Sequence, residues 1–73
     1  MKVTIHACER LLERVFNIKK PTLRQKYDAM TLLERETENI ISQPFKFKQK
    51  LTSFEGFYGV FKEQTLITII QEG

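Results

Sequence analysis

The sequence predicts a single α+β domain in which two helices pack on an antiparallel sheet. Three observations support this prediction: a length of 73 residues, a helical apolar period in the first half, and a two-residue period after Pro44. A chain of this length has room for one hydrophobic core, and 41% apolar residues with six phenylalanines suffice to form it. We therefore expect residues 1–73 to form one domain.

The N-terminal segment predicts a short strand followed by a helix. Residues 2–5, KVTI, favour β-structure, and residues 6–16, HACERLLERVF, carry apolar side chains at helical spacing. Asn17 can end this helix in a left-handed conformation. The side chains expected on its apolar face are Ala7, Leu11, Leu12, Val15 and Phe16.

A second helix is predicted from Thr22, which can cap it after Pro21, to about Ser42. Apolar residues recur there at intervals of three and four, which is typical of a helix with one buried face. The expected stripe comprises Leu23, Tyr27, Met30, Leu33, Thr37, and Ile40 or Ile41.

The C-terminal third predicts a meander of three antiparallel strands. In residues 45–51, FKFKQKL, apolar and lysine side chains alternate, which places Phe45 and Phe47 on the core face. A turn at SFEG leads to a strand at residues 57–63, and a tight connection leads to an apolar strand at 65–70 in the sheet interior. Residues 2–5 could add a fourth strand.

Charge and cysteine content narrow the function classes. The net charge is +3, but residues 10–26 carry +5 and residues 28–38 carry −3, an asymmetry that suits RNA, another polyanion or an acidic protein partner. One cysteine and one histidine exclude a disulfide framework and make a metal site unexpected, which fits a reducing, cytoplasmic location. No apolar run approaches the roughly 20 residues that span a membrane.

The first helix carries the candidate catalytic residues His6, Arg10 and Arg14. Their spacing of four residues forms a slowly drifting stripe on a helix, with Glu13 beside Arg10. An RNA-cleaving site needs a group that moves a proton near neutral pH and cations that hold phosphate. The alternative is that these residues form an ordinary exposed helix face.

The candidate RNA-binding residues lie on the predicted meander: Lys46, Lys48, Lys50, Tyr58 and Lys62. Lysines on one face of a strand can follow a phosphate backbone, or they can protect an exposed sheet edge from aggregation. A tyrosine on the same sheet can stack on a base or lie at the edge of the core.

The segment HACERLLER, written His-Ala-x-x-Arg-x-x-x-Arg behind a short strand, resembles the opening motif of small RelE-like domains of the barnase and RelE superfold. Such domains are commonly ribonuclease toxins or relics of them, often encoded by phages, prophages or mobile elements. The resemblance implies a metal-independent endoribonuclease without a cofactor, an antitoxin as partner, and polar roles for His6, Arg10 and Arg14. The tail Gln71–Gly73 lacks the His, Tyr or Arg that these nucleases often place there, which leaves Tyr58, Lys62 and Thr68 as further candidates.

We therefore expect RNA binding, with metal-independent cleavage if the site is active. The alternative is a non-enzymatic protein-binding module, such as a small phage-encoded inhibitor of a host protein. Convergence of His6, Arg10 and Arg14 with the lysines on a concave sheet surface favours RNA. Their exposure on the convex side of a helix favours a protein partner.

Overall fold

The computed structural model describes residues 1–71 and confirms the α+β class. The elements are β1 (Lys2–Val3), α1 (Ile5–Arg14), α2 (Leu23–Glu36), β2 (Gln43–Lys50), β3 (Phe57–Glu63) and β4 (Thr65–Gln71). The strands form one sheet in the order β1-β4-β3-β2. The three C-terminal strands pair antiparallel as predicted, but β1 pairs in parallel with β4, so the sheet is mixed.

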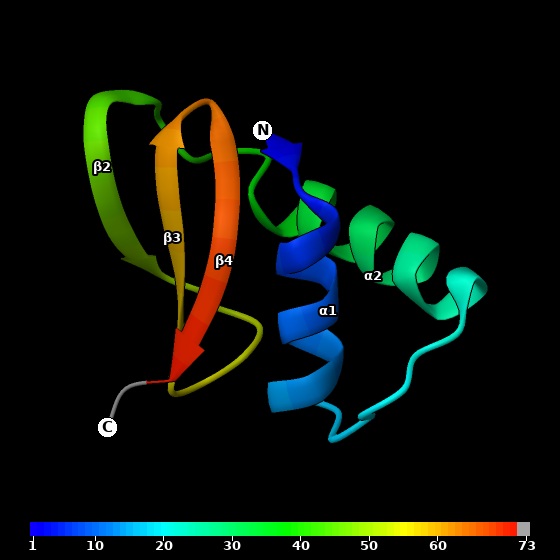
Figure 1. Ribbon diagram of the computed structural model, residues 1–73. Helices are drawn as coiled ribbons and strands as arrows, with labels where there is room; N and C mark the ends of the chain where they lie inside the picture. Colours follow the sequence, from blue (N-terminus) through cyan, green and yellow to red (C-terminus); the bar gives the residue numbers. More distant parts are fainter. Residues whose placement is uncertain (72–73) are drawn as a thin grey trace.

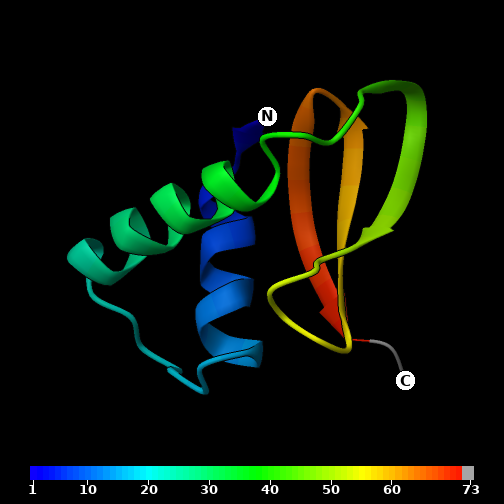
Figure 2. The same ribbon diagram turned by 180° about the vertical axis from the view of Figure 1, so that it is seen from behind.

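The two helices lie on one side of the sheet. α1 runs beside β4, and α2 packs on the side of α1 that faces away from the strands (Figures 1 and 2). The core lies between α1 and the sheet face that carries Phe61, Leu66 and Ile69. The opposite face of the sheet is not covered by either helix, and we call it the open face.

Thr4 connects β1 to α1 and holds both against β4. Its hydroxyl accepts a hydrogen bond from the Ala7 amide at 3.0 Å and donates one to the Ile67 carbonyl at 2.9 Å. Because this cap starts the helix at Ile5, the first strand is shorter than predicted. Asn17 follows the helix with φ 58°, the left-handed conformation that the sequence predicted.

α2 begins where expected but ends six residues early. Thr22 and Gln25 form a reciprocal capping box at its start. At the other end, the buried Thr37 donates its hydroxyl to the Leu33 carbonyl, and the chain then turns toward β2. This turn places Ile40 against the core and leaves Ile41 82% exposed, so the predicted extension to Ser42 is wrong.

The apolar face predicted for α2 is also partly wrong. Leu23 and Tyr27 are 63% and 55% exposed, whereas Ala29 and Leu33 are buried. The reason is that α2 packs mainly on α1 and only its C-terminal half approaches the sheet. On α1, Phe16 lies beyond the helix end and is 47% exposed, although its ring meets Phe54 edge-on.

β2 starts at Gln43 and includes Pro44, so the strand begins before the two-residue period that the sequence predicts after Pro44. Its register with β3 shifts between Gln43 and Lys46, and this irregularity turns Phe45 outward to 59% exposure. The prediction of Phe45 in the core is therefore wrong. Phe47 does pack on the core, with its ring stacked on Phe61 at a centroid distance of 5.1 Å.

Two local features shape the sheet core. Gly59 allows a close approach, because a Cβ there would lie 2.8 Å from the Phe61 ring. A register shift between Val60 and Phe61 makes Leu66 and Ile69, rather than Ile67, the buried residues of β4.

Within residues 1–71, no helix is long and apolar enough to cross a membrane.

Candidate nucleic-acid interface

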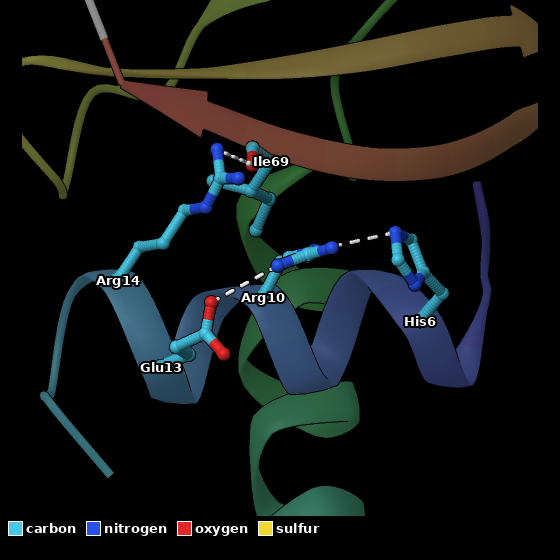
Figure 3. A network of polar contacts seen from close by, with 5 residues as sticks. All are labelled: His6, Arg10, Glu13, Arg14 and Ile69. Atoms are coloured by element: carbon cyan, nitrogen blue, oxygen red, sulfur yellow. Dashed lines mark hydrogen bonds and ion pairs between the residues drawn. The ribbon is translucent and has the colours of Figure 1, made fainter. Parts of the chain in front are cut away.

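His6, Arg10 and Glu13 form a small polar network on α1. The Arg10 Nε donates to the His6 Nε2 at 3.4 Å, and the Arg10 Nη1 lies 3.0 Å from the Glu13 Oε1 (Figure 3). All three side chains retain substantial exposure to solvent. The sequence prediction that Glu13 lies beside Arg10 is confirmed, and the histidine has a guanidinium beside it.

Arg14 has a different environment from Arg10. Its Nη1 donates to the Ile69 carbonyl at 3.1 Å, so the side chain reaches across to β4 (Figure 3). β1 pairs with β4 only at Thr65 and Leu66, and the β4 edge beyond them would otherwise offer unpaired carbonyls. Thr4 and Arg14 together bond two of these carbonyls, which gives Arg14 a structural role.

The three candidate catalytic residues lie in a row along one side of α1, but among them only Arg14 bonds to β4 (Figure 3). Each step of four residues rotates a side chain by about 40° around a helix. His6 is exposed and contacts Arg10, whereas Arg14 reaches the Ile69 carbonyl of β4 (Figure 3). A hollow of about 270 Å³ adjoins His6 and Arg10, and its lining mixes both charges: His6, Glu9, Arg10, Glu13, Lys19 and Pro21.

The predicted RNA-binding residues all lie on the open face. Lys46 and Lys48 flank Phe47, which points to the core, and Lys62 follows the buried Phe61. The strand register places Lys46 opposite Lys62, Lys48 opposite Val60, and Lys50 opposite Tyr58. All four lysines are exposed. The alternation in the sequence was sufficient to predict this arrangement.

The lysines of the open face differ from Arg10 and Lys26 in their partners. Arg10 pairs with Glu13, and Lys26 lies 3.0 Å from Glu9. In residues 1–71, the ion pairs include none for Lys46, Lys48, Lys50 or Lys62. In the described part of the chain, these four lysines therefore gather positive charge on one sheet face without a carboxylate partner, as Lys19, Lys20 and Arg24 do between α1 and α2 and at the start of α2.

Tyr58 belongs to the open face rather than to the core. The Lys48 Nζ lies 5.2 Å from the centroid of its ring, in a cation–π arrangement. The neighbours Phe57 and Gly59 point to the core side, so the Tyr58 ring must point away from it. The tyrosine is half-buried.

The structure brings the sheet residues together but keeps them apart from the α1 residues. Lys46, Lys48 and Lys50 lie on β2, and β3 separates β2 from the β4 edge that Arg14 contacts. Neighbouring strands are about 4.8 Å apart, so the lysine column lies about 10 Å across the sheet from β4. The convergence of the α1 residues with the lysines, which would favour RNA, is not found, so the support for RNA comes from the sheet residues alone.

Cys8 and the acidic residues offer no second centre of chemistry. Cys8 is fully buried in the core, and burial is the main cause that raises the pKa of its thiol. A thiol in that environment is a poor nucleophile. Among the described residues, no three His, Cys, Asp or Glu side chains are grouped so that they could hold a metal ion.

Sequence reasoning missed two residues that position α1. Thr4 was assigned to a strand, although a threonine directly before an apolar helical pattern is a common N-cap and could have been recognised. The Ile69 carbonyl could not have been found, because every strand residue has one and only the fold shows which is unpaired. Comparisons with protein-family models, curated proteins and solved structures found no match to this chain.

Proposed function

We propose that this domain binds RNA through the open face of its sheet. The observation that supports this function is the gathering of Lys46, Lys48, Lys50 and Lys62 on one exposed face without an ion-pair partner. Phosphates that bind there neutralise the lysines and release counterions, which favours association at low salt. The cations of α1 contribute less because Glu13 and the Ile69 carbonyl already engage Arg10 and Arg14.

The pairing of Lys46 with Lys62 strengthens this proposal. The two residues are directly opposite each other across β2 and β3. Like charges in that position destabilise a sheet, so the pair disfavours folding in the absence of a ligand. A phosphate placed between two ammonium groups turns this repulsion into two attractions, which is the arrangement expected of a polyanion site.

Matched charge removal tests this function. A variant with Lys46, Lys48 and Lys50 replaced by Gln should bind single-stranded RNA at least tenfold more weakly than wild type at low salt. The control variant, Lys19→Gln, Lys20→Gln and Arg24→Gln, removes the same charge from the connection between the helices and the first residues of α2. Equal loss of binding in both variants would show that net charge, not the open face, binds RNA.

Cleavage is a second candidate function, and the contact between His6 and Arg10 favours it. An imidazole can move a proton and an adjacent guanidinium can stabilise the charge that develops on phosphate. The pair is exposed, so an RNA chain that crosses the sheet from β2 past β4 could reach it. This proposal requires no metal, as the resemblance to RelE-like domains implies.

His6→Ala tests the cleavage proposal. Because His6 is exposed, the change should leave the melting temperature nearly unchanged while it lowers any cleavage rate about 100- to 10,000-fold. The assay follows the size of a labelled RNA with and without EDTA. A domain that binds RNA but leaves it intact is a binding module only. A domain that does not bind RNA even at low salt favours the protein-binding alternative, with an antitoxin or a host protein as partner.

A further inference from the structure

The open face carries an apolar strip beside its lysines. Tyr58 lies opposite Ile70, and Val60 lies opposite Thr68, across the pairing of β3 with β4. These four side chains are half-buried, although no helix covers them (Figures 1 and 2). A surface that needed only to repel other sheets or to stay soluble would place polar side chains here.

The strip and the lysines form parallel columns with different chemistry. Alternate residues of a strand are about 6.6 Å apart, so Lys46, Lys48 and Lys50 form a column along β2. Tyr58 and Val60 form a second column one strand away, at about 4.8 Å. A nucleotide chain that follows the lysines with its phosphates therefore has its bases above β3.

One face of the Tyr58 ring holds a cation of the open face. The Lys48 Nζ lies over the ring, 5.2 Å from its centroid. A base can take the place of the ammonium group on this face, since aromatic side chains stack on every type of base. The displaced lysine stays next to the phosphate of that nucleotide.

We propose that Tyr58 stacks on an unpaired base while the β2 lysines hold the adjacent phosphates, so that the open face selects single-stranded over double-stranded RNA. This inference rests on the proposed RNA-binding function and specifies its ligand. In a duplex, the base faces are covered by their neighbours and only phosphates remain accessible to the lysines. Tyr58 then contributes nothing to binding.

Two substitutions of Tyr58 separate stacking from packing. Tyr58→Leu removes the ring and keeps an apolar side chain, whereas Tyr58→Phe keeps the ring. The ligands are a single-stranded RNA of about 12 nucleotides, the same RNA in a duplex, and inorganic polyphosphate. We expect Tyr58→Leu to bind the single strand about five- to 100-fold more weakly than wild type and to bind polyphosphate with unchanged affinity. Tyr58→Phe should bind all three ligands with the affinity of wild type.

Tyrosine fluorescence gives a direct readout, because the chain has two tyrosines and no tryptophan. In a Tyr27→Phe background, emission comes from Tyr58, and a stacked base should quench it more than polyphosphate does. The exposed position of Tyr27 on α2 makes this background change harmless to the fold. The reciprocal variant, Tyr58→Phe, reports Tyr27 and should show no such quenching.

The outcomes distinguish the two proposals. The stacking inference is overturned if wild-type protein binds the single strand and the duplex equally and Tyr58→Leu binds the single strand as well as wild type does. The RNA-binding function is then still supported, because the protein binds RNA and polyphosphate. Wild-type protein that binds none of the three ligands at low salt overturns both. Loss of polyphosphate binding in Tyr58→Leu would show that the ring supports the lysines structurally and would also overturn the stacking inference.

Discussion

Arg14 and Ile69 are 55 residues apart in the chain, yet the Arg14 Nη1 donates to the Ile69 carbonyl at 3.1 Å. This hydrogen bond links the last turn of α1 to the part of β4 that β1 does not reach. Arg10, one helical turn away, makes only local contacts with His6 and Glu13. Two arginines of the same motif therefore have different roles.

We predict that Arg14→Ala destabilises the domain more than Arg10→Ala. Loss of the bond to β4 should lower the free energy of unfolding by about 1 kcal/mol. In a domain of this size that corresponds to a decrease of about 4 to 8 °C in melting temperature. Loss of the exposed Arg10–Glu13 pair should cost less than about 0.5 kcal/mol. Thermal unfolding monitored by circular dichroism measures both, and the reverse order would refute the structural role of Arg14.

The second prediction concerns the two isoleucines of β4 around the register shift. Ile69 is fully buried, so Ile69→Ala should lower the free energy of unfolding by about 2 to 5 kcal/mol. Ile67 is half-buried at the shift, and Ile67→Ala should cost clearly less. Urea unfolding curves of the two variants give the comparison. Equal losses would mean that the pairing of β3 with β4 has no register shift between Val60 and Phe61.

Gly59 provides a test of packing between β3 and β4. A Cβ at this position would lie 2.8 Å from two ring carbons of Phe61 and 3.0 Å from the Leu66 side chain. Gly59→Ala should therefore destabilise the domain by about 1 to 3 kcal/mol through overpacking. In the Phe61→Leu background the same change should cost much less, because the ring is absent. Additive losses in the double variant would rule out this contact as the cause.

Stability should decrease in acid partly because of Glu36. Its Oε2 accepts hydrogen bonds from the Thr52 hydroxyl at 3.0 Å and from the Ser53 amide at 3.1 Å. Partial burial alone would raise the pKa of Glu36, but these hydrogen bonds outweigh burial and lower the pKa below its ordinary value of 4.5. The carboxylate therefore stabilises the fold above the pKa of the unfolded chain, and this contribution is lost as the pH falls through the folded pKa.

The variant Glu36→Gln tests this contribution. It should be less stable than wild type at neutral pH, and the difference between the two should shrink as the pH falls below about 4.5. Free energies of unfolding from urea titrations at several pH values give the comparison. A difference that stays constant across this range would show that the Glu36 charge has no role in holding residues 52 and 53.

Much of the fold follows from local sequence patterns. The Pro21-Thr22 boundary, the strand at residues 57–63 and the alternation of lysines with Phe47 each depend on nearby residues, and the structure confirms them. The errors arise where contacts between residues far apart in the sequence determine the local structure. Phe45 points outward because the register with β3 shifts, and α2 ends at Glu36 because the chain must turn there to reach the sheet edge.

In the candidate site, too, the residues grouped by a local pattern were predicted correctly, and the contacts between distant elements were not. The side on which the β2 lysines lie follows from the period of a strand, so the sequence sufficed to group them. The grouping of His6, Arg10 and Arg14 was inferred from helical spacing alone, and spacing does not show what lies opposite each side chain. The β4 edge bonds Arg14, whereas His6 and Arg10 contact each other on α1. The last two residues of the tail lie outside the described residues, so the prediction about that tail stays untested.

The salt dependence of RNA binding tests the role of the open face most directly. Each phosphate contact to a single strand contributes about −0.7 to the slope of log affinity against log salt concentration. If each of the four lysines holds one phosphate, wild-type protein should show a slope of about −2.8, and the Lys46, Lys48 and Lys50 to Gln variant about −0.7. The variant with Lys19, Lys20 and Arg24 changed to Gln should keep nearly the wild-type slope. A wild-type slope that survives loss of the three β2 lysines would contradict binding by the open face.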